Sequence, residues 1–427
     1  MYEKIKKYGR ETFASIITIR NFRLYFIGQA ISLCGTWMQT IGQAWLVLKL
    51  TNSGVALGLV TAAQFLPILI LGAWGGVVAD RFPKRTLLYF TQISAGILAL
   101  LLGILVVTGL VQLWMVFVIA ALLGFVNVID NPTRQTFIME MVGEKNLTNA
   151  ISLNSTQVNL ARVIGPAIGG ALIATVGLAP LFFINAISYL AVLFALFKMK
   201  SYELHPYAIV AKGKGQVVAG FRYVMATPVL RDTLVMMAII GTLTYEFTVI
   251  LPLFAQFTFK SGASGYAALT VAMGFGSMLG GLYSASRKKT TPKMLTAAAF
   301  FFGLAMFIAA GAPTFLLAVI AMMLVGFCSI IFLSMGNVTL QTESAPQMRG
   351  RVMALWAVAF IGSTPIGGPI IGWIGQYAGP RWGLATGGLA ALVGAAIGAW
   401  RLKKGKRTAD AFEPGAETAI DSSSKVL

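Results

Sequence analysis

Two charged side chains stand inside long apolar stretches of this sequence and are placed to do chemistry. Arg162 lies within residues 149–174 and Glu246 within residues 232–257. A charge among apolar groups is costly unless it is paired or reaches water. A carboxyl group there can take up and release a proton near neutral pH, whereas a nearby arginine would favour its ionised form. The two residues are therefore predicted to form a proton-binding site, and a static ion pair is the competing interpretation.

The composition requires that these residues lie in a membrane. Of the 427 residues, 57% are hydrophobic and 11% are charged, too few polar groups to cover a soluble globule of this length. A membrane-spanning helix needs about 20 apolar residues. The sequence contains twelve such runs: 22–49, 54–79, 86–107, 112–134, 149–174, 179–197, 232–257, 264–286, 293–311, 314–336, 349–375 and 381–401. Both deep charges would lie roughly 20 Å from the start of their helices.

The basic residues predict the orientation of the chain in the membrane. With the N-terminus inside, 29 of the 33 Lys and Arg residues fall on the inner side, and the outer loops contain Lys49, Lys260 and Arg381. Positively charged loops stay in the cytoplasm, so both termini are predicted to be cytoplasmic. The net charge of +19 then reflects topology, and no nucleic-acid partner is expected. We expect a multi-pass protein of a bacterial cytoplasmic membrane.

An internal repeat divides the chain into two halves. A shift of 203 residues lays Gly165, Pro166 and Gly169 on Gly368, Pro369 and Gly372. The predicted fold is an all-α membrane protein of 12 transmembrane helices in two six-helix pseudo-repeats, with a substrate site between them near the midplane. The predicted parts, in chain order, are an amphipathic N-terminal segment (1–21), a first half (22–197), a cytoplasmic linker with an amphipathic helix (198–231), a second half (232–401) and a disordered tail (402–427).

Several short stretches resemble one family of transporters. The loop GGVVADRFPKR, from Gly75 to Arg85, is similar to the signature loop between the second and third helices of the major facilitator superfamily. NFRLYFIGQAISLCGTWMQ, WLVLKLTNSG, ARVIGPAIGG and MRGRVMAL extend the resemblance over roughly residues 20–401, to the exporter group that includes enterobactin exporters and macrolide efflux proteins. The resemblance implies alternating access and a small-molecule substrate.

The same resemblance implies a gate on the cytoplasmic side. Asp80 is expected to dock at the start of the eleventh helix, because a carboxylate is stabilised at a helix N-terminus. Lys84 is expected to pair with Asp130 at the inner end of the fourth helix. For Arg134, a role in gating and a role at the membrane boundary both stay open. The expected gate consists of Asp80, Arg81, Lys84, Asp130, Arg134, Arg349 and Arg351.

A Gly-Pro core in the fifth helix and its repeat predicts close helix packing. Small residues let helices from opposite halves approach, and proline bends a helix by removing a backbone donor. Tight packing without bending is the alternative. The residues concerned are Gly165, Pro166, Gly169, Gly368 and Pro369.

Polar side chains recur at helical spacing along the first and fifth helices. Such faces are costly in lipid, so they should look inward, either to line a cavity or to join helices. The residues predicted to line a substrate cavity, with two aromatic residues for its walls, are Gln29, Thr36, Gln39, Gln43, Asn159, Tyr245 and Trp356.

The motifs together favour a proton-coupled exporter of lipophilic or amphipathic small molecules, in monomeric form and without a cofactor or metal. The sequence contains no Walker loop, metal cluster or catalytic triad, so no enzyme is expected. A dedicated siderophore exporter is the alternative within transport. A non-transporting receptor or scaffold would need an ordered cytoplasmic module, which the tail does not predict.

Overall fold

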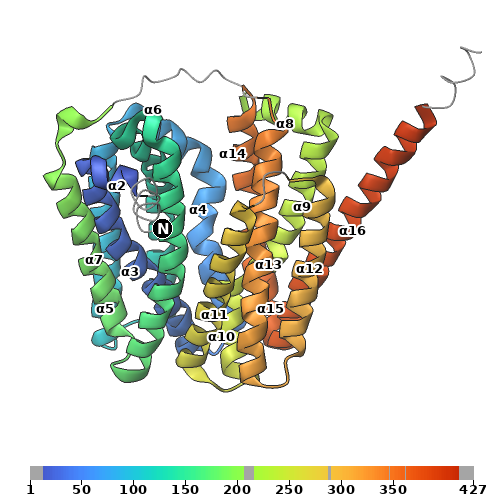
Figure 1. Cartoon of the computed structure of the whole chain (residues 1–427). Helices are drawn as coiled ribbons and strands as arrows, with labels where there is room; N and C mark the ends of the chain where they lie inside the picture. The colour runs from blue at the N-terminus through green and yellow to red at the C-terminus, as the bar shows by residue number, and fades with distance from the viewer. Residues whose placement is uncertain (1–12, 206–215, 287–289, 346, 361, 413–427) are drawn as a thin grey trace, which may run out of the picture.

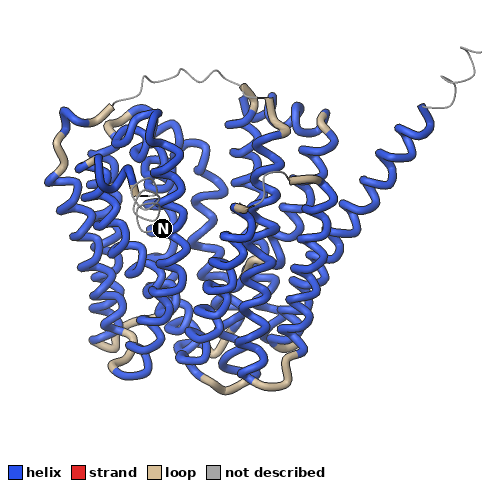
Figure 2. Tube along the Cα trace, in the orientation of Figure 1, coloured by secondary structure: helices blue, strands red, loops and turns tan. Residues whose placement is uncertain are grey.

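A computed structural model describes residues 13–205, 216–286, 290–345, 347–360 and 362–412. All regular secondary structure within these ranges is helical, as Figure 2 shows. The first half contains α2 (Ala14–Thr18), α3 (Arg20–Thr51), α4 (Gly54–Arg81), α5 (Lys84–Val107), α6 (Leu113–Thr175) and α7 (Ala179–Lys198). After η1 (Ser201–Glu203), the second half contains α8 (Gln216–Ala226), α9 (Pro228–Thr244), α10 (Phe247–Leu253), η2 (Phe254–Thr258), α11 (Gly262–Ala285), α12 (Pro292–Gly311), α13 (Phe315–Thr342), α14 (Arg349–Phe360), α15 (Thr364–Tyr377) and α16 (Pro380–Phe412).

The described residues include ten helices long and apolar enough to cross a membrane. One of them, α6, contains a break at Gly143, where φ is 66° and ψ is 173°. This glycine conformation divides α6 into two arms, which correspond to the predicted fourth and fifth helices. The polar residues of α3 keep that helix outside the ten, although it is 32 residues long. The total of twelve crossings stays a prediction.

The two halves form two helical bundles that stand side by side (Figure 1). Within the first half, α3 packs on α6 and α7, and α5 packs on α7. Within the second half, α11 packs on α13, and α12 packs on α13 and α16. Contacts between the halves join α4 to α15, α6 to α11, and α10 to α3 and α4. We call the end of the bundle with the α3–α4 connection the Asn52 side and the opposite end the Asp80 side.

A contact between glycines joins α4 to α15 near the Asn52 side. A Cβ atom on Gly58 would lie 2.7 Å from the carbonyl carbon of Gly368, and one on Gly372 would lie 2.9 Å from that of Gly54. Both distances are shorter than the 3.4 Å at which ordinary contacts begin, so the approach needs residues without a side chain. We call these four residues the glycine contact.

Hydrogen bonds extend the glycine contact toward the Asn52 side. The Gln376 side-chain oxygen of α15 accepts from the Ser53 hydroxyl at 2.7 Å and from the Val55 N–H at 3.1 Å. Ser53 also accepts from the Ala56 N–H at 3.1 Å and thus caps α4. The first turn of α4 is therefore bound to the opposite half.

Two helices extend past their predicted ends. The first arm of α6 continues beyond Arg134 to Val142, and α16 continues through Phe412. Residues 402–412 were predicted to be disordered, and this prediction is wrong; residues 413–427 lie outside the described ranges. The apolar runs underestimate these helices because a helix can continue past the hydrocarbon core, where polar residues face water. The helix α8 lies in the linker, where an amphipathic helix was predicted, and residues 1–12 of the N-terminal segment lie outside the described ranges.

Candidate functional site

Glu246 lies where a membrane helix is interrupted. The helix α9 ends at Thr244 and α10 begins at Phe247, and Glu246 between them has φ −81° and ψ 42°. Its backbone carbonyl accepts the Val249 and Ile250 N–H groups at 3.1 and 3.0 Å, so Glu246 starts the second helical segment. Interrupted helices near the membrane midplane form binding sites in many secondary transporters.

A second interruption lies beside the first. The helix α14 ends at Phe360 and α15 begins at Thr364. A Cβ atom on Gly367 would lie 2.8 Å from the Thr242 carbonyl carbon, and one on Gly241 would lie 2.8 Å from the Phe360 ring. The two breaks therefore touch. Four helix ends meet here, and backbone groups at helix ends can bind a ligand.

The Glu246 carboxyl group points at α15. The side chain is 2% exposed, and its Oε1 atom has no hydrogen-bond partner within the described residues. A Cβ on Gly367 would lie 2.9 Å from that oxygen. The Thr364 side chain is within hydrogen-bonding reach of the carboxyl group. Thr242, a predicted partner, instead donates to the Ala238 carbonyl at 2.7 Å.

Aromatic rings cover one flank of the two breaks. The Tyr245 ring meets the Phe360 ring edge-on at 4.7 Å between centroids, and its hydroxyl donates to the Ser329 carbonyl at 2.7 Å. The Trp356 ring stacks on Phe360 at 5.7 Å. The Trp356 indole N–H is buried without a partner in the described part of the chain. Tyr245 and Trp356 are thus brought together near Glu246, as an aromatic wall requires.

Arg162 faces the second half but does not pair with Glu246. Its guanidinium lies over the Trp37 ring, 5.0 Å from the centroid, and its charge interacts with Tyr245. Among the ion pairs of the described residues, none joins Arg162 to Glu246. The static ion pair is therefore not formed in this conformation. We call Glu246, Tyr245, Trp356, Thr364, Arg162 and Trp37 the central site.

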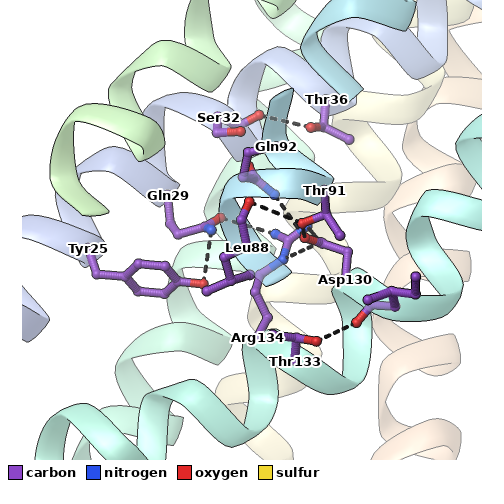
Figure 3. A network of polar contacts seen from close by, with 11 residues as sticks. Tyr25, Gln29, Ser32, Thr36, Leu88, Thr91, Gln92, Asp130, Thr133 and Arg134 are labelled. Atoms are coloured by element: carbon purple, nitrogen blue, oxygen red, sulfur yellow. Dashed lines mark hydrogen bonds and ion pairs between the residues drawn. The ribbon is translucent and has the colours of Figure 1, made fainter. Parts of the chain in front are cut away.

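Asp130 is the centre of a separate polar network within the first half, drawn in Figure 3. It is 1% exposed and accepts from the Thr91 hydroxyl at 2.7 Å, from the Gln92 amide at 2.8 Å and from Arg134 Nε at 2.7 Å. Arg134 also donates to Gln29 at 3.0 Å, and Gln29 donates to the Tyr25 hydroxyl at 3.0 Å. Every charge in this network has a partner. Its geometry stabilises the packing of α3, α5 and α6.

The predicted pairing of Lys84 with Asp130 is wrong. Lys84 Nζ lies 3.2 Å from Glu140 Oε1, and both side chains are 11% exposed. Because α6 continues to Val142, Asp130 lies roughly 18 Å inside that end of the helix. It bonds to Thr91 and Gln92, about two turns beyond Lys84 along α5. Glu140 occupies the end of the arm that Lys84 reaches.

The other predicted gate residues lie on the Asp80 side. Arg81 is exposed at the end of α4. Arg349 donates to the Gln341 carbonyl at 2.8 Å, and Arg351 donates to the Met348 sulfur at 3.3 Å. Docking of Asp80 on the start of α14 stays a prediction.

The predicted interface glycines divide between two kinds of contact. A Cβ on Gly165 would lie 2.6 Å from the Trp37 Cβ, and one on Gly169 would lie 3.4 Å from the Met38 Cα, both in α3 of the same half. The expectation that these two join opposite halves is therefore corrected. Their repeat partners Gly368 and Gly372 do contact the other half, and Pro166 and Pro369 lie inside α6 and α15.

Three of the seven predicted cavity residues, Gln29, Gln39 and Gln43, bond to side chains of other helices. The Asn185 amide donates to Gln39 at 2.6 Å, and Gln43 lies 3.4 Å from Gln64. Thr36 and Asn159 donate to backbone carbonyls of their own helices, each at 2.9 Å. The three glutamines therefore join helices, one of the two uses that the spacing allowed, and the cavity role of Thr36 and Asn159 stays a prediction.

A groove of about 570 Å³ lies away from the central site, between α11, α12 and α13. Its lining includes Tyr283, Phe301 and Ile331 and contains no charged side chain. It is suited to apolar contacts alone.

The protein has two helical halves, a contact between paired helices at one end and a polar site at broken helices. These features define a transporter of the major facilitator type. Residues 11–421 match the transmembrane secretion effector family, and the chain belongs to that family. Its relatives and apolar helices make it a multi-pass protein of a bacterial inner membrane. Members of this superfamily are transporters and not enzymes.

Two curated relatives have names that specify a substrate. The chain is 24% identical to the enterobactin exporter EntS of Shigella flexneri over 379 residues, which cover 87% of this chain and 89% of the relative. It is 31% identical to the staphyloferrin A transporter of Staphylococcus aureus over 176 residues, which cover 41% of this chain and 44% of the relative.

Solved structures support the fold. A bacterial homologue of the human lysosomal transporter Spinster, crystallised in an inward-facing and unoccupied conformation, superposes with a TM-score of 0.73 at 15% identity over 91% of this chain and 97% of that chain. The nucleoside transporter NupG superposes with a TM-score of 0.66 at 16% identity over 90% and 99%. These similarities concern the fold alone.

Proposed function

We propose that this transporter exports lipophilic or amphipathic small molecules by alternating access, driven by protons. The observation that supports this most directly is the position of Glu246. It lies at a double helix break of the second half, beside the Gly368 residue that contacts α4, with one carboxyl oxygen unpartnered among the described residues. A buried carboxyl group without a fixed partner can exchange a proton with whichever side of the membrane is open.

The contacts between the halves support an inward-open conformation. The glycine contact and the Gln376 hydrogen bonds join the halves near the Asn52 side, which the charge distribution predicts to be external. On the Asp80 side, α14 packs on α8, α9 and α13 of its own half. A substrate would therefore enter from the cytoplasm, and export requires that the glycine contact open while the Asp80 side closes.

A siderophore exporter is the second candidate. Two relatives support it by name, an enterobactin exporter that aligns over most of both chains and a staphyloferrin A transporter. Both candidates use the same site and the same alternating motion, and they differ in the molecule that the central site accepts.

Efflux from a deletion strain tests the proposal. We expect cells without the gene to retain more of a transported amphipathic dye than cells that express it, and collapse of the proton gradient to abolish the difference. If the deletion changes siderophore secretion and leaves dye retention unchanged, the second candidate replaces the first. If neither changes, the proposed export is refuted.

A further inference from the structure

Arg162 is a deep cation that the protein itself does not neutralise. It lies 13 residues before the end of the second arm of α6, roughly 20 Å inside the helix end. Within the described residues it makes no hydrogen bond and no ion pair, and its Nε atom is buried without an acceptor. Its contact with the Trp37 ring leaves the hydrogen-bonding groups in the guanidinium plane unused. A buried donor without an acceptor is costly, so a ligand that supplies an acceptor here would stabilise this state.

Arg134 shows what a structural arginine looks like in the same half. Its Nε and Nη groups donate to Asp130, and Nη1 also donates to Gln29 at 3.0 Å. The fold therefore supplies a carboxylate to one deep arginine and none to the other. If Arg162 served packing alone, the same kind of partner would stabilise it.

The surroundings of Arg162 specify what such a ligand would be. The charge of Arg162 interacts with Tyr245 of the other half, and Tyr245, Phe360 and Trp356 form a continuous group of rings. The Trp356 indole N–H is a second buried donor without a partner in the described ranges. Two unused donors beside aromatic faces suit a planar molecule that has an acceptor with negative charge.

We propose that Arg162 binds the anionic group of the transported molecule, and that the preferred substrates are aromatic or amphipathic anions. This inference rests on the proposed export function, because it assigns a ligand to the same site. Trp37 would hold the guanidinium by its flat face, which leaves the N–H groups at its edge for the ligand. Tyr245 and Trp356 would contact the aromatic part.

Binding of a matched pair of probes tests the proposal. The anion 2-naphthoate and the uncharged 2-naphthamide have nearly the same shape, so their affinities differ chiefly through charge. We expect purified protein in neutral detergent to bind naphthoate at least about ten-fold more tightly, as measured by equilibrium dialysis. In Arg162→Gln the preference should fall to about one, because the charge-assisted hydrogen bonds are lost.

Two further variants control this experiment. Arg162→Lys should keep part of the preference, because an ammonium keeps the charge and loses the planar fork. Arg222→Gln removes a positive charge from an exposed position on α8 and should leave the preference unchanged. Equal affinity of wild-type protein for the two probes, or weak binding of both, overturns the proposal. So does an undiminished preference in Arg162→Gln or, where that variant does not fold, in Arg162→Lys.

The outcome is separable from that of the export assay. An exporter that moves uncharged dyes and binds both probes equally would keep the proposed function and lose the anion site. A protein that prefers naphthoate but exports nothing would keep the anion site and lose the proposed function.

Discussion

Replacing Gly58 by alanine should open the Asn52 side of the bundle. The added Cβ would lie 2.7 Å from the Gly368 carbonyl carbon and 2.9 Å from the Pro369 Cα, where ordinary contacts begin at 3.4 Å. Because both neighbours are backbone atoms, no side chain can move aside. The helices α4 and α15 must separate by at least about 0.7 Å, the difference between 2.7 and 3.4 Å, because the Gly368 carbonyl oxygen lies closer still.

The size of the effect follows from the cost of overpacking. An added methyl group in a tight contact costs about 1–3 kcal/mol. This cost falls on the conformation in which the glycine contact is closed. Since about 1.4 kcal/mol is a factor of ten in an equilibrium constant, the open population should rise by about five-fold to about a hundred-fold.

The reporter is a cysteine at Leu253, in a protein whose native Cys34 and Cys328 are replaced by alanine. Leu253 is fully buried, and its Cδ1 lies 2.8 Å from Cβ atoms built on Gly54 and Gly375. A membrane-impermeant maleimide added outside the cell should modify this cysteine about five-fold to about a hundred-fold faster in Gly58→Ala than in the protein with Gly58.

Two controls accompany the measurement. Gly76→Ala changes the same helix at a position where a Cβ meets nothing within 4 Å, so it should leave the rate unchanged. A cysteine at Val192, buried in the core of the first half, should stay unreactive in Gly58→Ala, which excludes unfolding. An unchanged rate at the Leu253 position in Gly58→Ala would show that the glycine contact does not hold this side closed.

Three other substitutions test separate contacts. Gln376→Ala removes two hydrogen bonds to the first turn of α4 and should raise the same maleimide rate by about two- to ten-fold, because two exposed bonds together contribute about as much as one net hydrogen bond; a rate equal to that of the wild type would refute the role of Gln376. Lys84→Gln and Glu140→Gln should each lower the melting temperature in detergent, and the double variant should be little worse than either one, whereas additive losses would show that the pair does not interact. Gly165→Leu should reduce the amount of folded protein in the membrane, because the contact of Gly165 lies within one half. Normal abundance with slow export would instead support a contact of Gly165 between the halves.

The sequence predicts the helices well because a membrane leaves the chain few choices. Runs of about 20 apolar residues must form helices, since backbone groups in lipid have to bond within their own segment. The two halves were predicted from the repeat of Gly165 and Pro166 at Gly368 and Pro369, because a duplicated sequence pattern folds into a duplicated structural unit.

The pairing of side chains could not be predicted in the same way. Which glycines touch depends on helix packing, so Gly58 looked like any other glycine of an apolar run. The depth of Asp130 was missed because polar residues ended the apolar run at Arg134, although the helix continues to Val142. The break at Glu246 has no glycine or proline beside it, and its sequence gives no local sign of an interruption.

The central claim is that Glu246 binds and releases the coupling proton. Proteoliposomes that contain a pH-sensitive dye report proton movement when a transported substrate is added. We expect wild-type protein and the exposed control Glu343→Gln to move protons with substrate. Glu246→Gln, which imitates the protonated side chain, should show no substrate-driven proton flux but should still exchange substrate down its gradient. Substrate-driven proton flux that is undiminished in Glu246→Gln would contradict the claim.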